Sequence, residues 1–177
     1  MKGLIRIALV IALVAPATHG APLWLHIRVT EAGSHPATVK INLPYALVER
    51  AAPLVESEHV GDGEIVWNGD HVELSELRET WRALRAGKRT ITRDDASWTI
   101  VRDASGETLV VHELDTKSGA VVRIPARLVD ALLSGSGRLD FSAAVKVIAQ
   151  LGSGELVAVD EDGSNVRIWV DSTPEAE

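Results

Sequence analysis

The chain has 177 residues and no cysteine, and its 25 Asp and Glu outnumber its 18 Lys and Arg, for a net charge of −7. The absence of cysteine excludes disulfides, cysteine nucleophiles and a lipid anchor carried by a modified cysteine. An acidic chain with no basic stripe repels phosphate backbones, so we expect no nucleic-acid partner.

Residues 1–20 have the pattern of a secretory signal peptide. Two basic residues precede an unbroken apolar run over 7–15, and small residues suit cleavage before Ala21. This run is about half of the ~20 apolar residues that a membrane-spanning helix needs. We therefore expect a secreted or periplasmic protein with no stable membrane span after cleavage.

In the first half of the chain, alternating apolar residues predict strands, and apolar residues spaced three or four apart predict helices. Proline suits the first turn of a helix, and glycine suits its end. In chain order, the expected elements are strands at 24–30 and 39–43, a helix from Pro44 to about 55, a short strand at 65–67, a helix at 74–84 and strands at 90–92 and 98–101.

The second half of the chain shows the same kinds of pattern in the same order. The expected elements are strands at 109–114 and 121–124, helices at 125–133 and about 140–151, and strands at 156–159 and 166–170. Asp162 and Gly163 lie between the last two strands and are typical of a hairpin turn.

Two local motifs occur twice: residues 43–49 resemble 124–130, and the helical segment 74–84 resembles 141–151. We interpret this as a duplication, with generic strand and helix composition as the alternative. The predicted fold class is α+β: two tandem ββααββ repeats with antiparallel hairpins and short helices, packed as one pseudo-symmetric globule. The expected segments are a signal peptide at 1–20, a first repeat at 21–103 with an insertion at about 54–69, a second repeat at 104–172, and a disordered tail at 173–177.

The stretches Trp24–Val29 and Val39–Pro44, followed by Leu47 and Val48, resemble a poorly characterised bacterial module with an RIRV…VNLPLSLV pattern. That module ends much as residues 166–171 do, and it often accompanies SHOCT-like helical hairpins in envelope-associated proteins. This chain has no recognisable helical-hairpin extension. The resemblance implies a fold rather than catalytic residues.

The sequence contains no recognisable catalytic motif, and we predict no enzyme activity and no cofactor. No G-x-S-x-G turn is present, and the histidines show no paired helical spacing. Acidic groups at 56–59, 70–73 and 160–165 invite a cation, but solvated loops and turns have the same composition. We therefore predict no metal site.

The tryptophans are the best lead to a binding surface, because Trp and Arg often anchor interfaces. Alternation places Val166, Ile168 and Val170 inward and Trp169 on the other face; Trp24 falls with His26 and Arg28 in the same way. The predicted interaction residues are Trp24, His26, Arg28, Arg167, Trp169 and Asp171. The alternatives are that one repeat covers the other and buries both tryptophans, or that a homodimer forms through these faces.

The function that these observations favour is a non-enzymatic, extracytoplasmic protein-interaction module, whose partner is an envelope or secreted protein or a second copy of the chain. The alternative is a protein that binds a small ligand or divalent cation in a cleft between the repeats.

Overall fold

The computed structural model describes residues 22–34, 36–58, 64–67, 70–88, 90–93, 96–104, 106–114 and 119–175. The strands in these residues are β1 (Trp24–Glu31), β2 (Ala37–Pro44), β3 (Glu64–Trp67), β4 (Asp70–Glu73), β5 (Thr90–Arg93), β6 (Ala96–Asp103), β7 (Gly106–Glu113), β8 (Val121–Pro125), β9 (Gly154–Glu161) and β10 (Ser164–Asp171). The helices are α1 (Tyr45–Glu58), α2 (Leu74–Arg85), α3 (Ala126–Leu132) and α4 (Phe141–Leu151).

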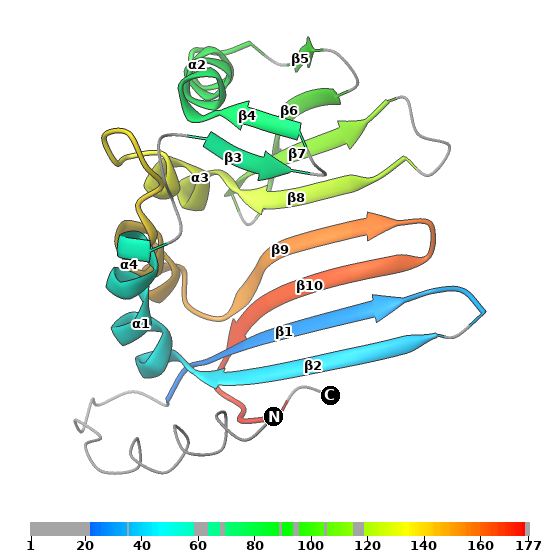
Figure 1. Ribbon diagram of the computed structural model, residues 1–177, viewed down its shortest axis with the longest axis vertical. Coiled ribbons are helices and arrows are strands. Elements are labelled where there is room, and N and C mark those ends of the chain that lie inside the picture. Colours follow the sequence, from blue (N-terminus) through cyan, green and yellow to red (C-terminus); the bar gives the residue numbers. More distant parts are fainter. Residues whose placement is uncertain are drawn as a thin grey trace.

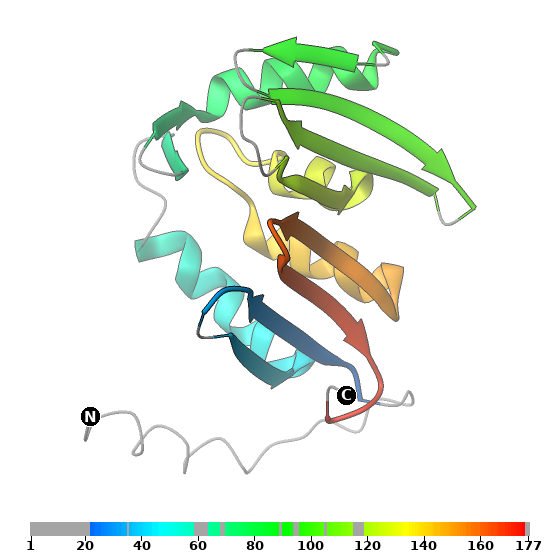
Figure 2. The same cartoon turned by 90° about the vertical axis from the view of Figure 1, so that its right-hand side faces the viewer.

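One antiparallel sheet of eight strands forms the centre of the fold. Its strand order is β2-β1-β10-β9-β8-β7-β6-β5, and β3 and β4 form a separate hairpin. The four helices lie against one face of the sheet (Figures 1 and 2). No helix in the described part of the chain covers the opposite face, which we call the open face.

The pairing of β1 with β10 follows their apolar residues. Leu25 lies opposite Val170, and Ile27 lies opposite Ile168. Because side chains alternate along a strand, this register turns all four toward the helices. Val170 has no exposed surface, so the helix-facing side of the β1–β10 pair is fully buried at this position. A two-stranded hairpin is marginal alone, and β10 therefore stabilises the β1–β2 hairpin.

Two hydrophobic clusters fill the space between the sheet and the helices. The first contains Tyr45, Leu128, Ala131, Ala144, Ile148, Leu156 and Val170. The second contains Trp81, Leu84, Leu109, Ala126 and Val129. Each cluster draws side chains from both halves of the chain, so neither half contains a complete core.

The predicted fold of two tandem ββααββ repeats packed as a pseudo-symmetric globule is wrong. The β1–β2 and β5–β6 hairpins of the first predicted repeat lie at opposite edges of the sheet, with β7 to β10 between them (Figure 1). The reason is that hydrogen-bond ladders and apolar faces join β1 to β10 and β6 to β7, across the predicted repeat boundary.

The repeated motif at 43–49 and 124–130 has a local explanation. In both places a strand ends at a proline, Pro44 or Pro125, and a helix begins at the next residue. Proline ends the ladder because it has no N–H, and its fixed φ is compatible with helix entry. Similar local chemistry therefore occurs in two elements that occupy different positions in the sheet.

Several local expectations are confirmed, including the β1–β2 hairpin, the short strand β3 and helix α4. Asp140 caps α4, since its side chain accepts a 2.7 Å hydrogen bond from the Ala143 backbone N–H. Pro53 lies within α1, which continues to Glu58 and so runs into the predicted insertion at 54–69. The predicted signal peptide, part of that insertion and the last two residues lie outside the described residues.

Candidate functional site

The six predicted interaction residues meet on the open face of the sheet. In the β1–β10 ladder, Trp24 lies opposite Asp171, His26 opposite Trp169 and Arg28 opposite Arg167. The alternation of side chains therefore places all six on one surface. We call this group, Trp24, His26, Arg28, Arg167, Trp169 and Asp171, the Trp169 cluster.

His26 forms the buried centre of the Trp169 cluster, with 0% of its surface exposed. Its Nδ1 lies 2.9 Å from Asn42 Oδ1, and its Nε2 lies 3.1 Å from Asp171 Oδ1. The imidazole also stacks on Trp169, with ring centroids 5.0 Å apart and an angle of 24° between the planes. His26 therefore ties β1 to β2 on one side and to β10 on the other.

Asp171 receives several hydrogen bonds. The Thr173 Oγ1 hydroxyl donates to its Oδ1 at 2.6 Å and the Thr173 backbone N–H at 2.7 Å, while Trp169 Nε1 donates to its Oδ2 at 3.0 Å. Hydrogen bonds to the charged form, first those from Thr173 and then those from Trp169 and His26, lower the pKa of the Asp171 carboxyl to about 2.

This lowered pKa predicts a stability change at acid pH. The carboxyl has a pKa of about 4 in an unfolded chain, so ionised Asp171 stabilises the fold above pH ~4. That stabilisation is lost as the pH falls from about 4 to about 2. We expect the urea midpoint of the native chain to fall more steeply across this window than that of an Asp171→Asn variant. The control Asp162→Asn, in the exposed β9–β10 turn, should follow the native chain; parallel slopes for Asp171→Asn and the native chain would refute the assignment.

An open hollow of about 580 Å³ lies beside Trp169. It is lined by Arg28, Ser153, Gly154, Glu155, Arg167, Trp169, Val170 and Asp171. A β-bulge shapes one side, because the β9–β10 pairing shifts between Ile168 and Trp169. The shift places Glu155 opposite Trp169, so β9 adds a carboxylate to the open face.

The two arginines of the Trp169 cluster have different surroundings. Arg167 Nη1 donates to the Val159 carbonyl at 2.9 Å, Nη2 pairs with Asp160, and Nε lies 3.6 Å from Glu155. The Arg28 guanidinium instead lies over the Trp169 ring, with Cζ 5.3 Å from the ring centroid. Arg28 Nε is buried and has no hydrogen-bond acceptor in the described part of the protein.

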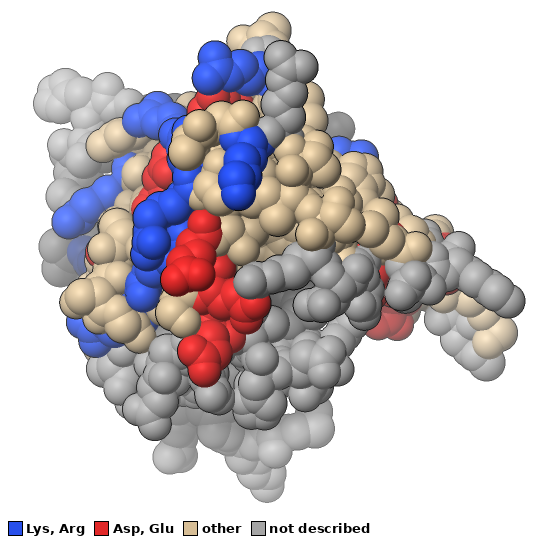
Figure 3. All heavy atoms as spheres, turned by 90° about the horizontal axis from the view of Figure 1, so that it is seen from above, with Lys and Arg blue, Asp and Glu red and all other residues tan. Residues whose placement is uncertain are grey.

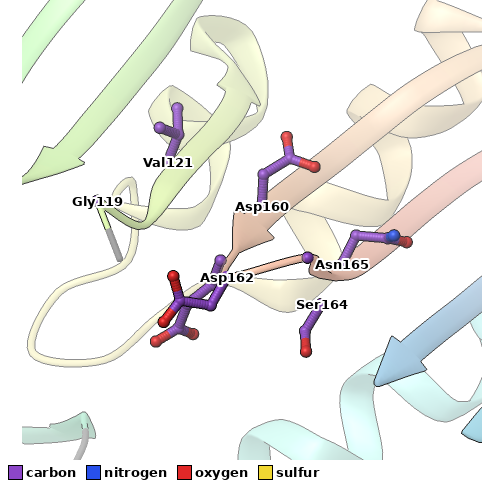
Figure 4. Close-up of a pocket in the computed structure, with 8 residues that line it drawn as sticks. Gly119, Val121, Asp160, Asp162, Ser164 and Asn165 are labelled. Carbon is purple, nitrogen blue, oxygen red and sulfur yellow. The ribbon is translucent and has the colours of Figure 1, made fainter. Parts of the chain in front are cut away.

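A second hollow, of about 240 Å³, lies beside the β9–β10 turn (Figure 4). Asp162 has a positive φ of 43° and Gly163 one of 79°, as a tight hairpin turn requires. The carboxylates of Asp160 and Asp162 point in different directions (Figure 4). Asp160 pairs with Arg167 and, at 2.8 Å, with Arg123. The acidic run at 160–165 therefore forms a turn and an ion-pair network.

Among the described residues, no group of three or more His, Asp or Glu is arranged to hold a metal ion. Two of the acidic groups named above lie mostly in residues 56–59 and 70–72, whose side chains are not among those that the structure describes. No helix in the described ranges is long and apolar enough to cross a membrane.

The end of the molecule formed by α2 and β5 carries Lys and Arg side chains beside Asp and Glu side chains (Figure 3). Arg85 of α2 bonds Glu107 and, at 2.8 Å, Asp130. Its guanidinium also lies over Trp81, with Cζ 5.4 Å from the ring centroid. Arg85 is thus paired with two carboxylates, and the expected lack of nucleic-acid binding stays a prediction.

Sequence reasoning did not include Asn42, Ser153, Glu155 and Thr173, which complete the surroundings of the Trp169 cluster. Alternation along 39–43 puts Asn42 on the same face as Lys40, which was an available signal. The position of Glu155 depends on the bulge, and sequence periodicity carried no sign of it.

The described fold and site define a protein built on an eight-stranded antiparallel sheet, with helices on one face and an aromatic, arginine-containing cluster on the other. No protein-family model, curated protein or solved structure matches this chain.

Proposed function

We propose that this protein is a non-enzymatic interaction module, acting outside the cytoplasm, that binds a partner protein through the Trp169 cluster. The observation that carries the proposal is the meeting of Trp169, Arg28 and Arg167 around one open hollow on the open face. Trp and Arg are the residues that most often dominate binding energy at protein interfaces. The signal-peptide pattern of residues 1–20 supports the location.

The surroundings of His26 support a binding role over a catalytic one. A general base must reach the proton that it abstracts from a substrate. His26 has no exposed surface, and both ring nitrogens lie within hydrogen-bond distance of neighbouring side chains. Its geometry suits the positioning of Trp169 and Asp171.

A small ligand is the second candidate, because the hollow of about 580 Å³ has a volume usual for small-molecule sites. The predicted ligand site was a cleft between two repeats, and the chain does not fold as two such repeats. The hollow beside Trp169 takes its place as the candidate location.

Photo-crosslinking in the native host tests the protein-binding proposal. The photoreactive residue p-benzoylphenylalanine replaces Ser153, which is exposed and lines the hollow; in the control it replaces Lys146, which is exposed on α4. We expect one discrete protein adduct from the Ser153 position and none from Lys146. A double Arg167→Ala, Trp169→Ala variant that keeps its native circular dichroism should lose at least about 90% of the adduct, because hot-spot truncation costs ~2 kcal/mol or more.

The mass of the adduct identifies the partner as a second copy of the chain or as another protein. Equal crosslinking from both positions, or no adduct from either, would contradict the proposal. Saturable binding of a small molecule, in the absence of any adduct, would favour the second candidate.

A further inference from the structure

Arg28 carries the buried side-chain nitrogen that has no hydrogen-bond partner among the described residues. No acceptor for this Nε–H lies within the described ranges. Its neighbours differ: Arg167 pairs with Asp160 and Glu155, and Arg123 pairs with Asp160. Because Nε is buried, a group from outside can reach Arg28 only through the Nη nitrogens at the end of the side chain, for which the structure shows no hydrogen-bond partner among the residues that it describes.

The acidic residues around the hollow are already engaged. Asp171 accepts hydrogen bonds from Thr173 and Trp169, and Glu155 lies beside Arg167. The positive charge of Arg28 therefore lacks a matching carboxylate although two carboxylates lie nearby. The guanidinium end of Arg28, which lines the open hollow, is therefore available to a carboxylate from outside the chain.

The stacking of Arg28 on Trp169 holds the guanidinium in one orientation beside the hollow, which suits the binding of a planar anion. The ring limits the motion of the arginine side chain, and both residues line the same hollow. A guanidinium binds a carboxylate through two parallel N–H donors, and such charge-assisted pairs are stronger than neutral hydrogen bonds. Trp169 supplies apolar contact area beside the same position.

We propose that Arg28 and Trp169 bind a carboxylate side chain, Asp or Glu, of an acidic segment in the partner protein. This inference rests on the proposed function, since it names the chemistry by which the Trp169 cluster recognises its partner. Arg28 supplies the charge, Trp169 the contact surface, and the hollow the space for the segment.

The test is an NMR titration of the ¹⁵N-labelled full chain with a blocked hexaglutamate peptide. We expect saturable shifts of the Arg28 Nε–H and Trp169 Nε1–H signals, and no shifts with a blocked hexaglutamine peptide. Arg28→Lys should weaken binding about tenfold, because an ammonium cannot form the parallel pair of bonds. Arg28→Gln should abolish binding, whereas Arg127→Gln, which removes an exposed arginine of α3 that bonds Gln150, should leave it unchanged.

The Arg28 variants should unfold at a urea midpoint only slightly below that of the native chain, because they weaken the contact with the Trp169 ring but break no hydrogen bond of Nε. Hexaglutamate binding that survives Arg28→Gln, or no binding to the native chain, would overturn the inference. If acetate at the same carboxylate concentration shifts the same two signals, the site recognises any carboxylate. The assignment of the ligand to an acidic segment of a partner protein would then be wrong. The crosslink from position 153 can still form in each of these cases. The titration can therefore refute the carboxylate ligand while the crosslink still supports binding of a partner protein.

Discussion

When the chain is divided between Asp103 and Ala104, we expect the two fragments to behave unequally. Residues 21–103 alone should show no cooperative unfolding in urea. Residues 104–177 should keep a cooperative transition, at a much lower urea midpoint than the whole chain. Circular dichroism and tryptophan fluorescence, followed through the same urea series, provide the measurement.

The inequality follows from the strand order. The first fragment contains β1–β2 and β5–β6, which do not neighbour each other in the sheet. The second contains four consecutive strands, β7 to β10, with α3 and α4. It lacks Tyr45 from the first hydrophobic cluster and Trp81 and Leu84 from the second. The second fragment therefore keeps a continuous four-stranded sheet with two helices but loses part of both clusters, which lowers its urea midpoint.

Mixing the two fragments in equal amounts is the control, and it should restore a transition closer to that of the whole chain. Cooperative unfolding of residues 21–103 alone, at a midpoint similar to that of 104–177, would contradict the single-sheet fold. It would instead support two independent repeats.

The second large effect is expected at His26. A His26→Ala variant should lose about 2–4 kcal/mol of unfolding free energy at pH 7, because it leaves a cavity and removes two partly buried hydrogen bonds. The ring that is removed is fully buried, bonds Asn42 and Asp171 and stacks on Trp169. Urea unfolding curves of the variant and the native chain measure this loss.

His112→Ala is the matched control, because His112 lies on the same open face of the sheet, on β7, but is exposed. Its unfolding free energy should change by less than about 0.5 kcal/mol, as is usual for surface positions. A similar loss in the two variants would show that the contacts of His26 with β2 and β10 do not stabilise the fold as proposed.

Part of the candidate site was predictable from short-range patterns. Alternation placed Trp24, His26 and Arg28 on one side of a strand, and Arg167 and Trp169 on one side of another. Such patterns depend only on neighbouring residues, because side chains in a strand alternate whatever lies beside it. The strands, the Asp162–Gly163 turn and the capped start of α4 come from the same kind of local information.

The error about tandem repeats had a physical cause. The motif at Pro44 and Pro125 describes how a strand passes into a helix, which is a local event. The choice of sheet neighbour depends on which edges and apolar faces can be buried together, and a local motif contains no information about this. Two similar segments can therefore occupy different places in one sheet.

By itself, the sequence determined the acidic, cysteine-free composition, the positions of most helices and strands, and the face on which Trp24 and Trp169 lie. Only the tertiary structure decided that His26 and Asp171, 145 residues apart in the chain, form a hydrogen bond. It also decided that Arg167 has carboxylate partners and that Arg28 has none among the described residues. The reason is that ion pairs, stacking and burial depend on the register between distant strands, and that register is set by the burial of the whole apolar face of the sheet.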